Sequence, residues 1–381
     1  MYIVAAKRTA VGAFGGKLKK LSATDLGTIS AKAVLTPELK VDSVIFGNVL
    51  QTSPDAVYLA RHVALKSGLP MSTPAYTINR LCGSGFQVVI NACEEISASG
   101  SNLILVGGTE SMSQAPFVTR GIRWGIPLGA NTPLEDSLMT TFYDSHCGLP
   151  MIETAEKLSQ RFNITRKESD GYSLLSQQRW KKANEDGTFD TEICPIELQK
   201  ETFLIDEHPK LSTLSQLAEL KAVSSQGRIT AGNASGICDG AAAMLIASQK
   251  AVDEQNLKPL SKIVGYSVCG VDPSEMGIGP AMAIRKLLNQ KGMNLTDIDI
   301  LEVNEAFSSQ VLAVCKELDV DPSSINDCGG GISIGHPLAA SGARILCSLS
   351  HRLQNTGKQY ALGSACIGGG QGIAVLLENC L

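Results

Sequence analysis

Two cysteines and one histidine lie in separate glycine-rich segments of this 381-residue chain. Cys82 lies in NRLCGSG, His336 in GGGISIGHP and Cys366 in GSACIGGG. A thiol becomes a nucleophile when a base removes its proton, and cleavage of a carbon–carbon bond needs a second acid/base for the carbon left behind. Backbone N–H groups in glycine-rich turns can stabilise an oxyanion. The three segments therefore offer a candidate for each of these roles.

The same residues also have structural explanations. The chain has 11 cysteines, an odd number, without a CxxC pair or a spacing typical of metal ligands. Most are therefore expected to be reduced, buried thiols, and no metal site is expected. A single histidine is more often structural than functional. The glycines before His336 weigh against that explanation, because a histidine that only packs needs no close backbone approach.

The sequence NEAF, which begins at Asn304, follows a strand that we expect to end near Val303. Functional groups of α/β proteins commonly lie at strand ends. Asn304 could orient a water molecule or an oxyanion, and Glu305 could hydrogen-bond the glycine-rich loops. An N-cap for a helix over 305–318 explains Asn304 equally well, so both interpretations stay open.

Composition excludes several classes of protein. The balance of 33 basic and 37 acidic residues gives no basic face for nucleic acid. No apolar run approaches the roughly 20 residues of a membrane span. P-loop and NAD-binding patterns are absent. We expect no signal or transit peptide, although five cations and no acid within residues 1–24 could form a weak import signal.

The elements that must position these groups alternate between short apolar strands and helices, which predicts an α/β fold. Strands are expected over 43–50 and 102–107, with a helix between them. Cys82 then precedes a helix N-terminus, where the helix dipole and free N–H groups favour a thiolate. His336 precedes a second helix, which opens near residue 341.

The second half of the chain restates the first. Residues 232–247 and 363–377 are both predicted to be small-residue turns running into an apolar strand, and 43–50 resembles 297–303. Such duplication predicts two similar α/β halves packed together. Residues from about 115 to 231 are more polar and break the pattern, so we expect an insertion of the kind that usually covers a site.

The blocks NRLCGSG, NEAF, GHP and CIGGGQG, in this order and spacing, resemble those of the thiolases. The resemblance runs from Val4 to Leu377 and is greatest to the mitochondrial 3-ketoacyl-CoA thiolases, through stretches such as YLARH and GGTESMSQAP. It implies a duplicated five-layered αβαβα core with an inserted loop domain. The implied units are an N-terminal half over 1–115 completed by 232–250, an insertion over 116–231 and a C-terminal half over 251–381.

The resemblance also implies a mechanism. His336 would deprotonate Cys82, which attacks the 3-keto carbon of a 3-ketoacyl-CoA. Cys366 would protonate the departing acetyl-CoA enolate and then activate free CoA, which takes the shortened acyl group from Cys82. One oxyanion hole would use His336 and a water held by Asn304, and the other the N–H groups of Cys82 and Gly368. CoA is a substrate, and no tightly bound cofactor is implied.

For CoA, the resemblance implies contacts from Ser235 and from the inserted segment. A cationic contact to the nucleotide falls near Lys210 and a hydroxyl near Ser212, while His146 matches a loop histidine that lines the acyl pocket. Lysine in place of arginine would keep the charge but lose a bidentate phosphate contact. A homodimer or homotetramer in the mitochondrial matrix is implied, with the cytoplasm as the alternative.

Four positions depart from the usual family pattern. Cys328, Gly331 and Ser333 lie where relatives usually have NGGAIA, and Ala339 lies where they usually have glycine. A methyl group at Ala339 would strain the loop of His336 if the backbone there needed a positive φ.

All three reacting groups are kept, so thiolytic cleavage in fatty acid β-oxidation is the expected activity, with the reverse condensation possible. The alternatives are an acetoacetyl-CoA thiolase and a silent acyl-CoA-binding or scaffold protein. A ketoacyl synthase would carry histidine in place of Cys366, and an HMG-CoA synthase would use a catalytic glutamate. The chain matches neither of these.

Overall fold

The N-terminal half of the chain contributes five neighbouring strands. In the computed structural model, which describes residues 1–381, their order is β4 (Ala75–Ile78), β3 (Ser43–Gly47), β5 (Leu103–Ser111), β13 (Cys238–Ala247) and β1 (Tyr2–Thr9). Strands β4, β3 and β5 are parallel, and β13 is antiparallel to both β5 and β1. Every residue of β3, β5 and β13 is buried, which explains their continuous runs of apolar and small residues.

The C-terminal half repeats this arrangement with β15 (Ile300–Val303), β16 (Tyr360–Ile367), β17 (Gln371–Asn379) and β14 (Ser261–Gly270). Strand β15 is parallel to β16, and β17 is antiparallel to both β16 and β14. The order and directions match those of β3, β5, β13 and β1, so the predicted duplication is confirmed. The turn predicted to begin at 363 is wrong, because residues 363–367 lie inside β16 and the turn is confined to 368–370.

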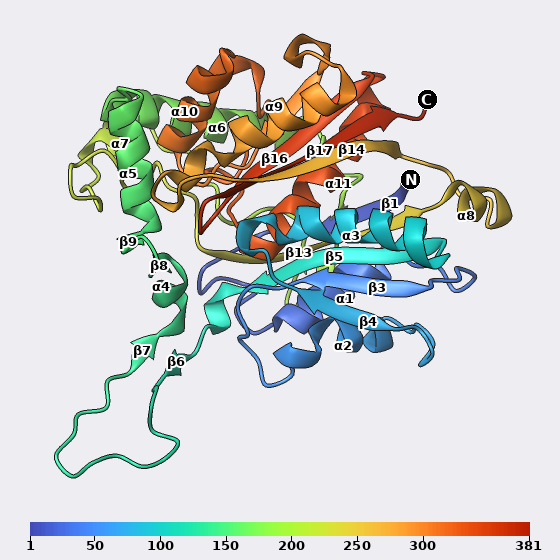
Figure 1. Ribbon diagram of the computed structural model, residues 1–381, viewed down its shortest axis with the longest axis horizontal. Coiled ribbons are helices and arrows are strands. Elements are labelled where there is room, and N and C mark those ends of the chain that lie inside the picture. Colours follow the sequence, from blue (N-terminus) through green and yellow to red (C-terminus); the bar gives the residue numbers. More distant parts are fainter.

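Helices form three layers around the strands (Figure 1). The outer face of the N-terminal strands carries α1 (Ala23–Lys32) and α2 (Leu59–Lys66), and the outer face of the C-terminal strands carries α9 (Gly279–Lys291) and α10 (Ser308–Leu318). Between the two sets of strands lie α3 (Ser84–Ser99) and α11 (Leu338–Thr356). Together they give the predicted αβαβα sequence of layers.

The central core joins the two halves, because it takes apolar side chains from both. Phe86 of α3 packs in the same cluster as Ile345 of α11 and Ile373 of β17. The helices α3 and α11 approach closely at their N-termini, where a Cβ atom on Gly85 would lie 2.3 Å from the backbone nitrogen of Ala343. Glycine is therefore required there, and the residues that precede both helices are brought together.

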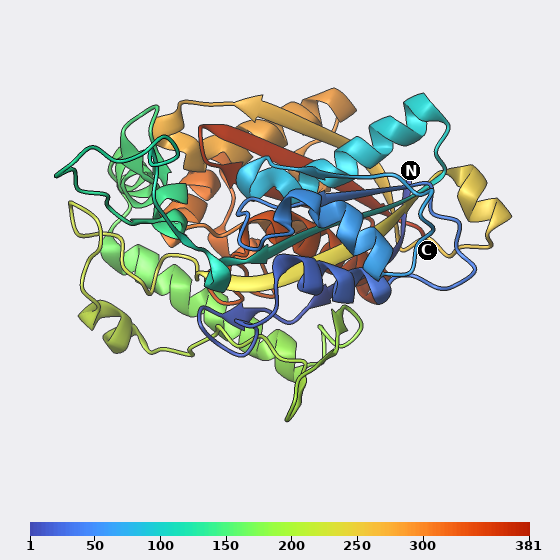
Figure 2. The same cartoon turned by 90° about the horizontal axis from the view of Figure 1, so that it is seen from below.

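The inserted segment lies along one side of this core (Figure 2). Its helices are α4 (Ser137–Thr141), α5 (Met151–Arg161), α6 (Arg166–Glu185) and α7 (Leu214–Glu219). Helices α5 and α6 pack against α10, and β10 (Ile193–Cys194) pairs with β1. Residues between β6 (Phe117–Val118) and β7 (Glu135–Asp136) form a loop that extends away from the core (Figure 1).

The remaining elements are short. They are β2 (Gly12–Ala13), β8 (Tyr143–Asp144), β9 (Leu149–Pro150), β11 (Ile196–Glu197), β12 (Thr202–Phe203) and α8 (Gln249–Glu254). None of the helices combines the length and the apolar character that crossing a bilayer requires.

Candidate active site

Cys82 lies in a single 3₁₀ turn that leads from β4 into α3. The preceding residue, Leu81, has a φ of +46°, which is uncommon for a residue with a side chain. Its N–H donates to Oδ1 of Asn79 at 2.9 Å, which holds this conformation in place. Gly83 is needed on the other side, because a Cβ there would lie 2.4 Å from Cδ1 of Ile367. The turn is therefore tightly held and presents the Cys82 side chain to a pocket.

The Cys82 thiol is neutral in the resting site. Burial raises its pKa to about 11, although the N–H groups of Gly368 and of Cys82 itself act in the opposite direction. The N–H groups favour a thiolate, as predicted for this location, but loss of hydration outweighs them in this state. Chemistry at this sulfur therefore needs a base.

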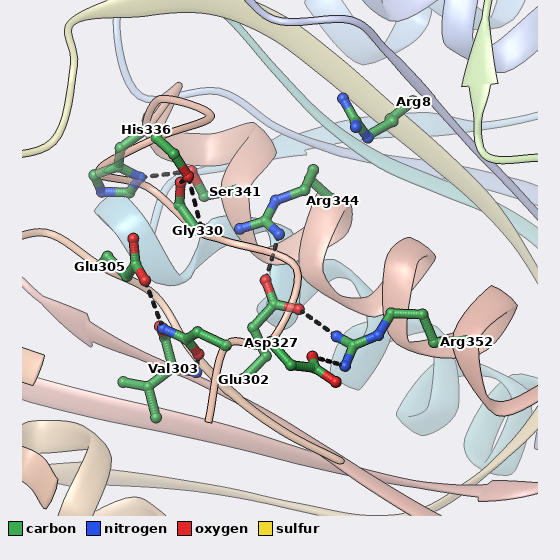
Figure 3. A network of polar contacts seen from close by, with 12 residues as sticks. Arg8, Glu302, Val303, Glu305, Asp327, Gly330, His336, Ser341, Arg344 and Arg352 are labelled. Atoms are coloured by element: carbon green, nitrogen blue, oxygen red, sulfur yellow. Dashed lines mark hydrogen bonds and ion pairs between the residues drawn. The ribbon is translucent and has the colours of Figure 1, made fainter. Parts of the chain in front are cut away.

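His336 is the candidate base, and the fold places it in the same pocket. Its Nδ1 lies 2.5 Å from Oγ of Ser341 (Figure 3), and its Nε2 lies 3.4 Å from Nδ2 of Asn304. Because the Asn304 amide nitrogen is a donor, Nε2 is the accepting nitrogen and Nδ1 carries the hydrogen. Burial, followed by the charge of Arg344, lowers the pKa of His336 to about 4. The imidazole is therefore neutral at physiological pH and can accept a proton.

The turn before His336 depends on Gly335. Its φ is +110°, and a Cβ there would lie 2.8 Å from Sγ of Cys238. The backbone N–H of His336 donates to the carbonyl of Gly236 at 3.1 Å. These contacts fix the ring at the start of α11.

Cys366 lies near the end of β16 and is almost fully buried. Burial, with a smaller contribution from Cys82, raises the pKa of the Cys366 thiol well above its usual value. The next turn places Gly368 so that its N–H group interacts with the sulfur of Cys82. Gly369 and Gly370, both with φ of +80°, make that turn possible. A proton donor and an N–H group thus flank the candidate nucleophile.

Asn304 follows β15, as predicted, and is buried. The alternative explanation as an N-cap is wrong, because α10 begins at Ser308 and its N-cap residue is Phe307. The Asn304 N–H donates to the carbonyl of Ser364 at 2.8 Å, and its Oδ1 has no protein partner. The Asn304 Oδ1 can therefore accept a hydrogen bond from a water molecule beside His336.

Glu305 holds the glycine-rich loop in place. Its buried carboxylate accepts hydrogen bonds from Tyr172 Oη at 2.9 Å, Ser176 Oγ at 2.7 Å, Asn326 Nδ2 at 3.0 Å and the N–H of Ile332 at 3.0 Å. Two of these donors lie on α6 of the inserted segment, and two lie in the loop that leads to His336. The predicted role of Glu305 in bonding the motif loops is confirmed.

The predicted reacting groups line one pocket. Cys82, His336, Cys366, Gly368 and Ser235 are among its 13 lining residues, nine of which are hydrophobic. The apolar walls come from both halves and from the insertion, and they comprise Leu81, Phe142, Met151, Met276, Ala306, Phe307 and Leu338. Such walls exclude water and suit an acyl chain, while the thiols and the imidazole supply proton transfer.

The other predicted CoA residues lie outside this lining. Lys210 is exposed, and the N–H of Ser212 donates to Oε1 of Gln177 at 2.7 Å. His208 of the same loop lies against Gly236, the residue after Ser235, because a Cβ on Gly236 would lie 2.1 Å from Cε1 of His208. The segment that carries Lys210 and Ser212 therefore passes close to Ser235, and neither residue lines the pocket.

His146 is exposed in the turn between β8 and β9 and is not one of the pocket-lining residues. Its N–H donates to Oδ1 of Asp144 at 2.8 Å, which fixes the turn. Phe142 and Met151, on either side of this hairpin, line the pocket instead. The structure thus does not bring His146 to the acyl pocket, because the hairpin directs its two ends inward and its tip outward.

The departures from the family pattern are accommodated. Ala339 lies in the first turn of α11 and does not have a positive φ, so its methyl group does not strain the backbone of the His336 loop. A Cβ on Gly331 would lie 2.5 Å from the carbonyl oxygen of Glu305, and Ser333 Oγ lies 3.0 Å from Ser176 Oγ. Cys328 is half-buried, and burial raises its pKa to about 12.

Glu110 lies beside this site, although it was not among the residues expected from the sequence. It lies near the end of β5, is fully buried and accepts hydrogen bonds from the N–H groups of Leu50 at 2.9 Å and Ala339 at 3.2 Å. The sequence feature that could have identified Glu110 is the presence of an acidic residue within the apolar and small-residue run LILVGGTES, which forms the buried strand β5. Only the fold shows that this run ends beside both Cys82 and the start of α11.

Comparison with known proteins gives a consistent result. Residues 1–250 match the family model for the thiolase N-terminal domain, and residues 257–379 match that for the thiolase C-terminal domain. The chain is 53% identical over 390 residues to the mitochondrial 3-ketoacyl-CoA thiolase of Bos taurus, covering 100% of this chain and 98% of the relative.

Two solved structures are similar to this chain in both sequence and fold. The crystal structure of human mitochondrial 3-ketoacyl-CoA thiolase superposes with a TM-score of 0.98 at 53% identity, covering 100% of this chain and 98% of that one. The structure of the same human enzyme in complex with CoA gives a TM-score of 0.97 at 54% identity, with coverages of 99% and 97%.

Proposed function

This chain belongs to the thiolase family, and from that premise we propose that it cleaves 3-ketoacyl-CoA with CoA through a thioester on Cys82. It is an acyltransferase, and the bovine and human relatives described above carry the name 3-ketoacyl-CoA thiolase. The observation that carries the proposal is the single apolar pocket that brings together Cys82, His336 and Cys366.

In the first step, Nε2 of His336 takes the proton from Cys82, and the sulfur bonds to the 3-keto carbon. The carbonyl π electrons move to oxygen, which becomes an oxyanion. His336, now protonated, and a water held by Asn304 form one candidate oxyanion hole. The N–H groups of Cys82 and Gly368 form the other. The assignment is supported by the neutral state of the imidazole and by the Gly368 N–H directed at the sulfur.

In the second step, the oxyanion collapses and the bond between C2 and C3 breaks. The shortened acyl group remains on Cys82 as a thioester, and the electron pair leaves with the acetyl-CoA enolate. Cys366 donates its proton to the enolate carbon, which gives acetyl-CoA. The raised pKa of Cys366 supports this role, because its thiol keeps the proton until a strong carbon base forms.

In the third step, the Cys366 thiolate takes the proton from the thiol of a free CoA molecule. The CoA sulfur attacks the thioester, and the acyl group leaves as acyl-CoA. The departing Cys82 thiolate regains its proton from His336, so that every group returns to its starting state. No metal or tightly bound cofactor takes part, and CoA is a substrate.

We also propose how CoA reaches the pocket. The inserted segment 116–231, between the core halves 1–115 with 232–250 and 251–381, supplies Lys210 and Ser212 at the rim, and Ser235 borders the inner end. The ammonium group of Lys210 suits a phosphate of the nucleotide. A homodimer or homotetramer in the mitochondrial matrix is proposed by similarity to the relatives.

The decisive experiment follows loss of the 3-ketoacyl-CoA enolate absorbance on adding CoA, over chain lengths from four carbons upward. We expect CoA-dependent decay that Cys82→Ala abolishes and that Cys380→Ala, at an exposed thiol outside the pocket, leaves intact. Decay with the four-carbon substrate alone would favour an acetoacetyl-CoA thiolase. Retained decay in Cys82→Ala, or acyl-CoA binding without decay at any length, would refute the proposal.

A further inference from the structure

Glu110 is a buried carboxylate that has no basic side chain as a partner. It is 0% exposed, and none of the ion pairs of the structure includes it. Acidic side chains are rarely buried in this way unless paired with a cation or used in function. The family mechanism proposed above gives it no role.

Four donors from two separate segments satisfy the Glu110 carboxylate. Oε1 accepts from Nδ2 of Asn48 at 3.0 Å and from the N–H of Leu50 at 2.9 Å. Oε2 accepts from the N–H groups of Val49 and Ala339, each at 3.2 Å. Three donors thus belong to the loop after β3, and the fourth belongs to the first turn of α11.

On the α11 side, hydrogen bonds connect Glu110 to His336. Ala339 lies in the turn whose free N–H groups attract a negative charge. Two residues later in the same turn, Ser341 places its Oγ 2.5 Å from Nδ1 of His336. A shift of this helix N-terminus would therefore move the imidazole.

On the other side, hydrogen bonds connect Glu110 to Cys82. The Val49 carbonyl accepts from Nδ2 of Asn79 at 3.4 Å, and the Asn79 Oδ1 accepts from the N–H of Leu81 at 2.9 Å. Leu81, with its φ of +46°, directly precedes Cys82. The strained conformation that presents the nucleophile is therefore tied to the same carboxylate.

The charge of Glu110 also acts on the candidate nucleophile. The titratable groups that face Glu110 are Asp239 and Cys238 on β13 and Cys82 before α3. The loop after β3 and α11 present to it only an amide and backbone N–H groups. A carboxylate at this position opposes a second negative charge on the sulfur of Cys82.

We propose that Glu110 is a positioning residue, which holds the turns of Cys82 and His336 at their working separation and whose negative charge adds to the effect of burial in disfavouring a free thiolate on Cys82. This inference rests on the proposed function for its kinetic consequences. Burial, offset in part by the bound N–H groups, raises the pKa of Glu110 to about 7. As the pH falls below about 7, the carboxylate gains a proton and loses acceptor capacity, which weakens its hold on both turns.

The test is Glu110→Gln, which keeps the shape but removes the charge and half of the carboxylate's acceptors. We expect kcat to fall roughly 10- to 100-fold, because misplaced reacting groups cost about that much. The decline in kcat below pH 7 should disappear. Alkylation of Cys82 by iodoacetamide should be roughly 2- to 10-fold faster in Glu110→Gln than in the wild type, since one pKa unit is a tenfold change in the thiolate population. Peptide mass mapping between pH 7 and 10 measures this rate.

Two further variants make the result specific. Glu110→Asp keeps the charge but is one methylene shorter, so we expect a lower kcat with the wild-type alkylation profile. Glu156→Gln is the matched control, because Glu156 is also buried and accepts from the N–H of Arg228 at 3.1 Å and its Nη1 at 2.7 Å, away from the pocket lining. The Glu156→Gln variant should lower the Tm and leave kcat and the alkylation profile of Cys82 unchanged.

Wild-type kcat in Glu110→Gln would overturn the inference. So would a lower kcat with unchanged alkylation, since a merely structural glutamate would act only through the folded fraction. If Glu110→Gln fails to fold, wild-type kcat in Glu110→Asp would overturn it. Alkylation needs no substrate, so it reports on Glu110 even if the chain-length series shows no thiolysis.

Discussion

The residues of the pocket are all neutral at rest, and that state follows from their burial. Loss of hydration raises the pKa of the two pocket thiols and lowers that of the imidazole, because in each case it disfavours the charged form. The free protein therefore does not contain a thiolate–imidazolium ion pair at this site. Charge develops only when the substrate arrives and the N–H groups of the pocket meet an oxyanion, which is where they contribute most to rate.

His336→Gln tests this at the level of one side chain. We expect kcat to fall roughly 10²- to 10⁴-fold, the usual contribution of a general base. In Glu110→Gln, which lacks the titrating carboxylate, kcat should show no titration near pH 6.5, because burial lowers the pKa of His336 to about 4. The control His62→Gln, at a histidine half-exposed beside Asp55, should leave kcat unchanged.

The same pKa shift predicts a stability effect. Between about pH 4 and 6.5 the unfolded chain binds a proton at His336 and the folded chain does not, so stability rises with pH across this window. Urea unfolding at several pH values should show a shallower rise in His336→Gln. An equal slope in both proteins would contradict the lowered pKa.

At the scale of elements, the site is made by the starts of two helices and the ends of two strands. The turns before α3 and α11 carry Cys82 and His336, while Cys366 and Asn304 lie at the ends of β16 and β15. Close packing of α3 on α11 sets the separation of the first pair, and the parallel pairing of β15 with β16 sets that of the second.

Gly335→Ala tests how strictly the turn before α11 is defined. The φ of +110° and the contact with Cys238 should together destabilise the fold by about 1–3 kcal/mol and displace the imidazole. We expect a loss of kcat larger than the loss of folded protein explains. The control is Gly357→Ala at the other end of α11, where φ is +68° but no atom lies within 4 Å.

Gly357→Ala should cost about 1 kcal/mol in urea unfolding, from the positive φ alone, and leave kcat at the wild-type value. Equal kcat losses in the two variants would show that the contact at Gly335 does not position the catalytic histidine.

At the scale of the whole molecule, a buried ionic network ties the C-terminal strands to the central helix (Figure 3). Glu302 of β15 bonds Arg344 and Arg352 of α11, and Arg352 also bonds Asp327 in the glycine-rich loop before His336. The two arginines and Glu302 are almost fully buried. This network therefore joins two layers and the loop of the active site.

Glu302→Ala should destabilise the protein by about 3–5 kcal/mol, because it leaves buried arginine charges without their shared partner. The matched control, Glu254→Ala, breaks an exposed pair with Lys250 and should change stability by less than about 1 kcal/mol. Urea unfolding measures both. A similarly small change in Glu302→Ala would mean that the network contributes little to the packing of α11 on the C-terminal strands.

Residue types and local order were enough to predict the reacting groups, the alternation of strands and helices, and the duplicated halves. These features depend on short-range patterns, namely the glycine-rich blocks, the strand periodicity and the placement of Cys82 before a helix. Asn304 remained ambiguous between a cap and a functional amide, because the start of α10 at Ser308 is decided by packing. The turn assigned to 363–367 was wrong because small residues also suit a buried central strand.

Only the tertiary structure decided the electrostatics of the pocket and its supporting contacts. Burial of Cys82 and His336 comes from segments far away in the chain, so no local pattern predicts their pKa shifts. Glu110 lies 229 positions from Ala339, whose N–H it accepts. The exposed position of His146 and the absence of strain at Ala339 likewise depend on how the insertion and α11 pack. The type of each reacting residue is a property of the local sequence. The loss of hydration of these residues and the distances between them are properties of the assembled fold.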